Sequence, residues 1–232
     1  MNISVIIPVF IEASVIESTI GWLLKDCIHK QVIEIIVVDG GSTDGSAALA
    51  ANSGALIVHS GKGRAAQMNA GAAIARGQLL YFLHADTKPP NNYVVFINTA
   101  LKYGYDMGCF RLQFDRDHWF LRANTWFTRF NVNYFRFGDQ SLFVKKELFK
   151  KTGGFNESLI VLEDQEMIRR LRMYGKFNVM PAAVITSARK YTTNGIYKTQ
   201  AVYFLIYLLF RLGVSQQRLV SLYKKLIRQD KL

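Results

Sequence analysis

The chain has 232 residues, half of them hydrophobic and 13% aromatic, which excludes a disordered chain and a small disulfide-stapled domain. Its formal net charge of +12 predicts attraction to polyanions such as phosphorylated ligands or an anionic membrane face. Since no block of Arg and Lys with interleaved aromatic residues is present, we expect no nucleic-acid partner.

Strands and helices alternate over the first 90 residues. In chain order, the hydrophobic pattern predicts strands at 3–10, 34–39, 55–59 and 79–83, with helices at 13–30, 46–52 and 64–76 between them. Runs such as Ile35–Val38 are apolar on both faces, as in buried parallel strands. This repetition predicts right-handed crossovers and an α/β fold with a Rossmann-like, mostly parallel central sheet flanked by helices.

The second half is less regular. Here the pattern predicts a helix at 91–103, a strand at 107–114, an aromatic-rich segment at 119–137, a return to the sheet at 138–144 and helices at 163–174, 197–212 and 216–228. The composition shifts near Thr192. We therefore expect one domain over 1–190 and a C-terminal helical extension over 191–232, packed on the domain or facing a membrane.

Cys27 and Cys109 have no neighbours of the kind that zinc sites need. They are expected to be buried apolar residues in a reducing compartment, although the sequence leaves their pairing open. Residues 1–5 lack the features of a signal peptide, and no run reaches the roughly 18 apolar residues that span a bilayer. A cytoplasmic protein is the expectation.

Candidate ligand-binding residues follow each of the first four strands. They are Glu12, Asp39, the loop 61–64 and Asp86. Ligands bind outside the carboxyl ends of parallel strands. The sequence therefore predicts a binding site at this edge of the sheet.

Two of these residues suggest a nucleotide. The carboxylate of Asp39 could accept hydrogen bonds from a base or ribose, and the neighbouring glycines allow close approach of a flat ring. Arg64 begins a helix, where a cation and free amides suit a pyrophosphate. The alternatives are that Asp39 only starts a turn and that Arg64 is a solvated surface residue.

Five motifs, in this order and spacing, resemble glycosyltransferase family 2. They are Ile6-Ile7-Pro8-Val9-Phe10 with Glu12, Ile36-Val37-Val38-Asp39-Gly40-Gly41-Ser42-Thr43-Asp44, Arg64-Ala65-Ala66-Gln67-Met68-Asn69-Ala70-Gly71, Leu83-His84-Ala85-Asp86 and Glu163-Asp164-Gln165-Glu166. The likeness covers residues 1–190. The tail from 188 to 215 is similar to a small bacterial branch known as selenodomain-associated transferases.

On the donor side, the resemblance implies a GT-A fold and a nucleoside-diphosphate sugar, with uridine the commonest base. It places the base against Asp39, with Pro8, Glu12 and Gly41 lining the nucleotide pocket, and the diphosphate against Arg64. Asp86 matches the last carboxylate of the metal-binding Asp-x-Asp motif, which implies Mn²⁺ or Mg²⁺. His84 stands where that motif has its first aspartate, so it is either a metal ligand or a structural histidine.

On the acceptor side, the resemblance implies that Asp164 is the general base of an inverting transfer to a hydroxyl. As local physics, Glu163-Asp164 would also suit a helix cap. The other residues matched to the acceptor side are Gly138, Asp139, Gln140, Glu163, Glu166, Arg189 and Tyr191. A Gln-x-x-Arg-Trp motif of processive members is absent from the sequence, which favours a single transfer.

The apolar run Ala201–Phe210 lies between Lys198 and Arg211. It could lie on an anionic membrane at the cytoplasmic face, pack on its own domain, or form a homodimer interface. Acceptors in this family are often lipid-linked, so a lipid-linked acceptor is compatible with the first alternative.

Two other functions compete with sugar transfer. Residues 61–66 fit the GxGxxA pattern of a dinucleotide-dependent oxidoreductase, with Asp86 downstream, although that fingerprint normally follows the first strand of its unit. This hypothesis also leaves Asp39 and Asp164 without a role. The second alternative is a non-catalytic nucleotide- or glycan-binding module, which only the histidine at position 84 supports.

Overall fold

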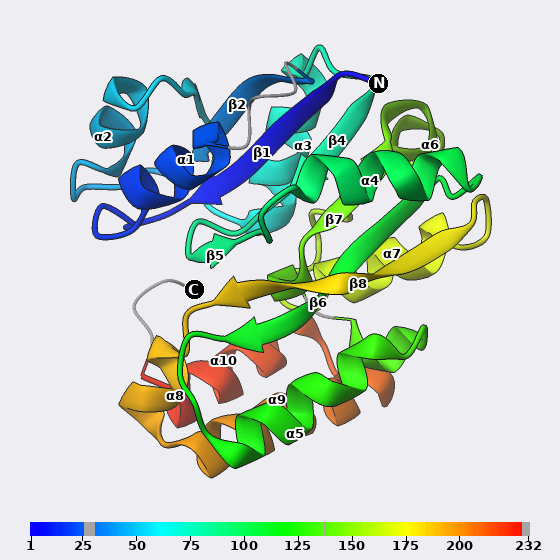
Figure 1. Ribbon diagram of the computed structural model, residues 1–232. Helices are drawn as coiled ribbons and strands as arrows, with labels where there is room; N and C mark the ends of the chain where they lie inside the picture. The colour runs from blue at the N-terminus through cyan, green and yellow to red at the C-terminus, as the bar shows by residue number, and fades with distance from the viewer. Residues whose placement is uncertain (26–30, 137, 229–232) are drawn as a thin grey trace.

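The computed structural model describes residues 1–25, 31–136 and 138–228 (Figure 1). The strands are β1 (Ile3–Val9), β2 (Val32–Asp39), β3 (Leu56–His59), β4 (Leu79–Phe82), β5 (Thr87–Lys88), β6 (Met107–Phe114), β7 (Leu142–Lys145) and β8 (Phe177–Thr186). The helices are α1 (Ile16–Lys25), α2 (Ser46–Asn52), α3 (Arg64–Ile74), α4 (Tyr93–Lys102), α5 (Trp119–Trp126), α6 (Lys146–Lys151), α7 (Glu163–Leu171), α8 (Arg189–Asn194), α9 (Ile196–Arg211) and α10 (Gln216–Leu226). Single 3₁₀ turns lie at η2 (Phe127–Arg129), η3 (Asn133–Phe135) and η4 (Gly138–Gln140).

In the described part of the chain, the strands form one sheet in the order β3-β2-β1-β4-β7-β6-β8-β5. The first four are parallel, as the alternation of strands and helices predicts. Strand β7 runs antiparallel to both β4 and β6, while β6 and β8 are parallel to each other. The α/β fold with a mostly parallel sheet is therefore confirmed.

Strand β8 is the longest element that the sequence pattern missed, beside the shorter β5, α6 and α8. It contains Pro181, which removes a backbone donor and argues against an interior strand. The structure accommodates the proline at a shift in the register with β6, where Cys109 pairs with Val179 but Arg111 pairs with Ala183. The irregular pairing, together with a burial pattern that does not alternate, hides this strand from a search for period-two hydrophobicity.

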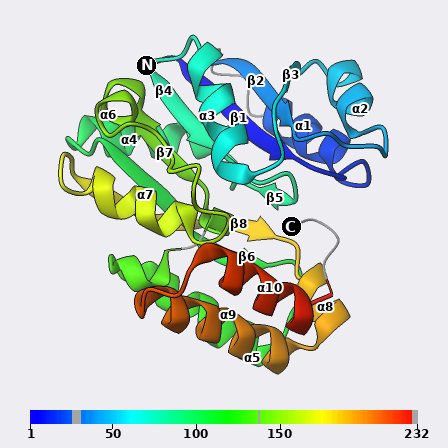
Figure 2. The same cartoon turned by 180° about the vertical axis from the view of Figure 1, so that it is seen from behind.

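Helices cover both faces of the sheet. Residues Ile3, Val5 and Ile7 of β1 belong to the same buried cluster as α1 and α4, which lie on the face seen in Figure 1. Ile6, on the opposite side of β1, packs in a second cluster with α3 and α7, the helices in front in Figure 2. This two-sided burial explains why the predicted parallel strands are apolar throughout.

Helix α3 lies close to the sheet and is tied to its carboxyl edge. A Cβ atom on Gly71 would come within 2.6 Å of the Ile6 side chain, so only glycine allows this approach. The Gln67 amide donates to the carbonyls of Val9 and Val38, at 2.7 and 2.8 Å. These contacts hold the helix so that Arg64, its first residue, lies beside the ends of β1 and β2.

The C-terminal helices form a layer with α5 below β6 and β8 (Figure 1). Val202 and Ile206 of α9 pack against Leu219 and Tyr223 of α10. The predicted boundary between residues 190 and 191 falls inside α8, and the division into a domain and an extension stays a prediction. In the described residues, no helix is long and apolar enough to cross a bilayer.

The two cysteines have different outcomes. Cys109 is free and buried in β6, as expected for a small apolar residue. Cys27 lies outside the described residues, as does the end of the helix predicted at 13–30.

Candidate active site

The ends of β1 and β2 are joined by an ordered turn. The Asp39 carboxylate accepts hydrogen bonds from the backbone amides of Gly41 and Ser42, at 3.2 and 3.1 Å. The loop after β1 is tied to the same turn, because the Glu12 amide donates to the Ser46 hydroxyl at 2.8 Å. Pro8 lies opposite Val38 in the parallel register. The structure thus gathers the residues expected around the nucleotide, and Asp39 also has the turn-forming contacts of the alternative interpretation.

Arg189 connects the C-terminal layer to this edge. Its guanidinium forms a bidentate pair with the Glu12 carboxylate, at 2.9 and 2.7 Å. The same group lies 3.0 Å from Asp86 Oδ2. Burial and the nearby Asp139 raise the pKa of Asp86, while Arg189 opposes that rise. Arg189 therefore neutralises two carboxylates that the sequence assigns to the donor side.

His84 is paired with Asp139. Its Nδ1 atom lies 2.9 Å from Asp139 Oδ1. Burial lowers the pKa of His84, but the bond to Asp139 outweighs it and the pKa lies above its usual value. Burial acts in the opposite sense on Asp139, whose pKa nevertheless falls below its usual range because of His84 and the cations Lys190 and Arg64. In this pair, each group favours the charged form of the other.

Asp86 and His84 could supply only part of the coordination shell of a divalent cation. No cluster of three or more His, Cys, Asp or Glu side chains is arranged to hold a metal among the residues that the structure describes. Asp86 offers a carboxylate, and His84 could offer Nε2, since its Nδ1 atom is oriented by Asp139. Mg²⁺ commonly takes one or two protein carboxylates and completes its shell with substrate phosphates and water. The residues present fit that kind of site.

Asp164 lies at the start of α7, in a dense group of charges. The side chain of its neighbour Glu163 is fully buried and pairs with Arg64 Nε at 3.0 Å. Burial, together with the charge on Glu163, raises the pKa of Asp164 to about 7, although His84 and Arg64 oppose this rise. A carboxyl with a near-neutral pKa can both accept and release a proton at physiological pH.

Gly138 makes room for Asp164. A Cβ atom at position 138 would lie 2.2 Å from Asp164 Oδ2 and 2.9 Å from His84 Cε1. Any larger residue would displace the carboxylate or the imidazole. The Gly138-Asp139 pair therefore has a physical role on the acceptor side: the glycine admits Asp164 and the aspartate holds His84.

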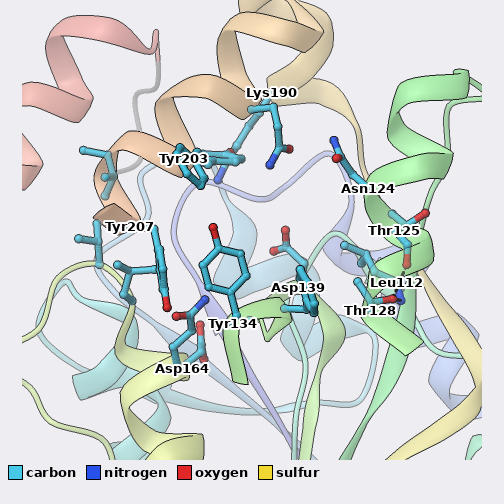
Figure 3. A pocket seen from close by; sticks show the side chains of 18 of the residues that line it. Leu112, Asn124, Thr125, Thr128, Tyr134, Asp139, Asp164, Lys190, Tyr203 and Tyr207 are labelled. Carbon is cyan, nitrogen blue, oxygen red and sulfur yellow. Dashed lines mark hydrogen bonds between the residues drawn. The ribbon is translucent and has the colours of Figure 1, made fainter. Parts of the chain in front are cut away.

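A cavity of about 740 Å³ opens next to Asp164. Figure 3 shows Asp164, Asp139 and Tyr134 on one side of it and Lys190 and Tyr203 on another. Its walls come from α5, the 3₁₀ turns η2 to η4, the start of α7 and helices α8 to α10. Tyr191 lines the cavity and donates to Gln200 Oε1 at 3.0 Å.

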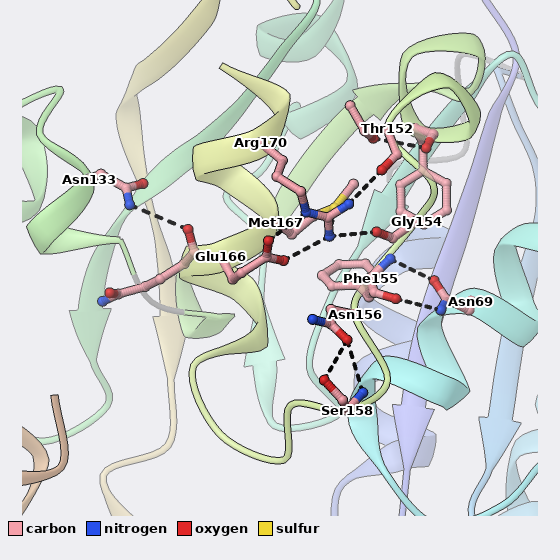
Figure 4. Close-up of polar contacts among 12 residues, drawn as sticks. Asn69, Asn133, Thr152, Gly154, Phe155, Asn156, Ser158, Glu166, Met167 and Arg170 are labelled. Atoms are coloured by element: carbon pink, nitrogen blue, oxygen red, sulfur yellow. Dashed lines mark hydrogen bonds and ion pairs between the residues drawn. The ribbon is translucent and has the colours of Figure 1, made fainter. Parts of the chain in front are cut away.

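Three residues matched to the acceptor side do not line this cavity: Arg189, which pairs with Glu12 and Asp86 as described above, Glu166 and Gln140. Glu166 pairs with Arg170, at 2.6 and 2.8 Å, and Arg170 in turn donates to the carbonyls of Thr152 and Gly154 (Figure 4). Buried Gln140 lies close to the Phe110 carbonyl, at 3.3 Å. The geometry thus gives the side chains of both Glu166 and Gln140 structural partners.

Several lining residues carried no signal in the sequence. Lys190 directly follows Arg189, and burial lowers its pKa while Asp139 opposes the change. The tyrosines that face the cavity come from four separate segments. They are Tyr134, Tyr191, Tyr197, Tyr203, Tyr207 and Tyr223. Of these tyrosines, the sequence assigns only Tyr191 to the site, because aromatic residues at helical spacing give the same pattern in a core and in a pocket.

Replacement of Asp164 by Asn should change how stability depends on pH. In the folded protein the pKa of Asp164 is about 7, above the 3.8 that is ordinary for an aspartate. The stabilisation that this shift provides is therefore fully present at low pH and is lost as the pH rises to about 7. The free energy of unfolding of wild type should therefore fall, relative to Asp164→Asn, between about pH 4 and pH 7 and then stay level. Urea unfolding of both proteins measures this difference. A difference independent of pH would contradict the raised pKa.

Comparison with known proteins agrees with this geometry. The model of glycosyl transferase family 2 matches residues 4–155. An undecaprenyl-phosphate 4-deoxy-4-formamido-L-arabinose transferase of Proteus mirabilis (strain HI4320) is 32% identical over 131 residues, covering 53% of this chain and 40% of that protein. The chain thus spans less than half the length of this curated relative.

Two solved structures share the fold. The mannosyltransferase PcManGT from Pyrobaculum calidifontis, in complex with GDP-Man and Mn²⁺, has a TM-score of 0.70 at 18% identity, over 88% of this chain and 62% of that one. S. aureus TarS 1-349, in complex with UDP, has a TM-score of 0.67 at 17% identity, over 81% of this chain and 61% of that one.

These findings overturn the oxidoreductase hypothesis. Residues 61–66 belong to the loop before α3 and to its first turn, after the third strand rather than the first. The finer likeness to the selenodomain-associated branch stays a prediction. Because the family model matches well over half of the chain and the fold agrees, this protein belongs to glycosyl transferase family 2 and is a glycosyltransferase with the GT-A fold.

Proposed function

We propose that this protein transfers a sugar from a nucleoside-diphosphate donor to an acceptor hydroxyl, in one metal-assisted displacement that inverts the anomeric carbon. The observation that carries this proposal is Asp164. Its carboxyl has a pKa raised to about 7 and lies where the carboxyl edge of the sheet meets a cavity large enough for an acceptor. A general base works best when its pKa is near the operating pH.

The transfer requires one bond to form and one to break. The acceptor oxygen attacks the anomeric carbon from the face opposite the diphosphate, and the bond to the diphosphate breaks with its electron pair. Asp164 takes the proton of the hydroxyl as the new bond forms. Because a single displacement occurs, the configuration inverts.

Asp39, Glu12, Pro8 and Gly41 are proposed to hold the base and ribose, with uridine as the base. Support comes from their common place at the ends of β1 and β2. The fold relatives were solved with UDP in one case and GDP-Man in the other, so both bases are tested below.

Two cations lie within reach of the diphosphate site. Arg64 begins α3 and Arg189 joins Glu12 to Asp86. Both are paired with carboxylates, so each would exchange part of that contact for phosphate oxygens on donor binding.

Asp86, with His84, is proposed to hold Mn²⁺ or Mg²⁺. When bound, the cation would neutralise charge on the departing diphosphate. Because the described residues provide few ligands for the cation, the phosphates of the nucleotide would complete its coordination. The cation is therefore expected to raise the affinity for the nucleotide as well as the rate of transfer.

Calorimetric titration with UDP, GDP, dTDP and NAD, each with and without Mn²⁺, tests the donor assignment. We expect one nucleoside diphosphate to bind with a dependence on Mn²⁺, and NAD not to bind. Asp86→Ala should remove the Mn²⁺ dependence of nucleotide binding and leave a weaker, metal-independent affinity. Unchanged Mn²⁺ dependence in that variant would remove Asp86 from the metal site.

Replacement of Asp164 by Asn should lower the turnover rate by roughly a hundredfold or more, while the affinity for the nucleoside diphosphate stays within about twofold of wild type. The amide keeps the shape of the carboxyl but cannot accept a proton. Turnover and calorimetry on the same preparation measure both effects. Equal loss of turnover and affinity would mean that Asp164 binds the donor. Nucleotide binding by wild type without turnover on any acceptor would favour the non-catalytic module.

Helix α9 suggests where the acceptor comes from. It buries Val202 and Ile206 against α10 but leaves Phe204, Leu205 and Leu208 exposed. The apolar run is therefore partly packed on its own domain, as one alternative expected, and partly open. Basic residues lie at both ends of the helix, which favours an anionic surface as the partner of its open side.

We propose that this side of α9 contacts the inner face of the cytoplasmic membrane and that the acceptor is lipid-linked. The name of the Proteus mirabilis relative includes undecaprenyl phosphate, a lipid acceptor. The protein should co-sediment with vesicles of anionic lipid at low salt and be released at high salt. Retention in the supernatant as a monomer would contradict membrane contact, and retention as a dimer would assign the exposed side of α9 to a homodimer interface.

A further inference from the structure

We infer that the cavity beside Asp164 is a binding site for a long apolar chain, whose terminal oxygen is the nucleophile. The inference rests on the proposed function, because it places the acceptor at Asp164. It adds the chemical class of the acceptor and the position of its apolar part: along α5, α9 and α10, toward the solvent-exposed end of the cavity.

The lining is strongly aromatic. Of the 27 residues around the cavity, 11 are Phe or Tyr, and several Leu, Ile and Val side chains stand between them. Large aromatic surfaces favour apolar ligands and leave few hydrogen bonds for a polar one. Polar side chains such as Asn124, Thr125 and Gln200 stand among these rings, but most of the lining surface is apolar.

The charged lining residues come from only a few segments of the cavity wall. They are Arg64, Asp139, Glu163, Asp164 and Lys190. Each comes from the start of α3, α7 or α8 or from η4, and none of the described lining residues of α5, α9 or α10 is charged. A ligand that fits this division has one polar, reactive end and an apolar remainder.

The aromatic and aliphatic side chains that line the cavity differ in how far they are buried. Tyr191, Tyr223 and Ile206 are buried, whereas Tyr197 and Phe204 are 57% and 55% exposed. Apolar lining therefore continues from the interior to the surface, on the helix that we propose touches the membrane. A chain could enter from a lipid layer without passing through water.

One unpartnered polar group points to a ligand oxygen. Gln165 lines the cavity, its side chain is 5% exposed, and its Nε2 atom donates to no described residue. A buried donor is normally paired. It follows Asp164 in the chain, so the polar end of an acceptor could satisfy it.

Two ligand sources share this chemistry, a long-chain alcohol and its phosphate. With the alcohol, Asp164 receives the hydroxyl proton; with the phosphate, the attacking oxygen is already ionised and no proton has to be removed. Farnesol and farnesyl phosphate serve as probes of the two sources. Geranyl phosphate and inorganic phosphate test how much of the affinity comes from the chain.

Ala201 offers a way to block the cavity without removing a buried contact. It lines the cavity from α9, and it is an exposed, small residue. Ala201→Trp should fill part of the space. Ala123→Trp is the matched control, because Ala123 is equally small and exposed on α5 but does not line the cavity.

Equilibrium binding of the probes, together with UDP binding on the same preparations, tests the inference. Wild type should bind a farnesyl probe at least about tenfold more tightly than the geranyl one, since each buried methylene contributes about fourfold, and inorganic phosphate should not compete. Ala201→Trp should lose at least about tenfold in farnesyl affinity, whereas Ala123→Trp should match wild type. UDP affinity should be the same in all three proteins.

Equal affinity for long and short chains, or equal farnesyl binding by the two tryptophan variants, would overturn the inference. Failure of UDP to bind wild type, with chain-length-dependent probe binding intact, would instead overturn the proposed donor. Tight binding of farnesol would identify the alcohol as the acceptor type. Binding restricted to farnesyl phosphate would identify the phosphate, and Asp164→Asn would then retain transfer.

Discussion

Charge balance at the carboxyl edge of the sheet constrains most of what is built there. Besides Asp39, whose carboxylate accepts from the amides of its own turn, five carboxylates meet at or near this edge: Glu12, Asp86, Asp139, Glu163 and Asp164. A buried carboxylate without a partner is costly, so each must be paired, protonated or reached by solvent. Arg189 forms ion pairs with Glu12 and Asp86. His84 pairs with Asp139, and Arg64 pairs with Glu163. For Asp164, burial and the charge on Glu163 raise the pKa to about 7, within the physiological range.

The same balance limits how a donor can bind. A diphosphate brings further negative charge to an edge whose cations are already paired. If Arg64 or Arg189 turned fully to the phosphates, Glu163 or the Glu12–Asp86 pair would lose its partner. A divalent cation at Asp86 would supply the missing charge. The metal proposed at Asp86 would thus balance the carboxylates as well as the diphosphate.

The C-terminal layer adds a second environment beside the first. Helix α8 carries Arg189 into the charged edge, while α9 and α10 present apolar and aromatic side chains to the cavity. The proposed transfer, from a charged donor to a lipid-linked acceptor, would use both environments. Here they meet at the start of α7, where Gly138 gives Asp164 its space.

Much of the fold follows from the sequence because its signals are local. The apolar runs of β1 and β2, the glycine-rich turn after Asp39 and the position of Asp86 after β4 are properties of short segments. They bring the residues assigned to the donor side to one sheet edge. Helix α9 was likewise expected from its apolar periodicity. The return of residues 138–144 to the sheet was expected, but the antiparallel direction of β7 and the irregular strand β8 were not, since both depend on pairing with distant strands.

Only the tertiary structure decided which partners these residues have. Glu12 and Arg189 are 177 positions apart, and His84 and Asp139 are 55 apart. No local pattern specifies such pairs, because they depend on how the sheet, α3 and the C-terminal helices pack together. The cavity has the same origin: its tyrosines look like core residues in the sequence, and they become a binding surface because α5, α9 and α10 leave space between them. The sequence by itself determined the sheet and the type of residues at its edge, while packing determined their charge states and the shape of the acceptor site.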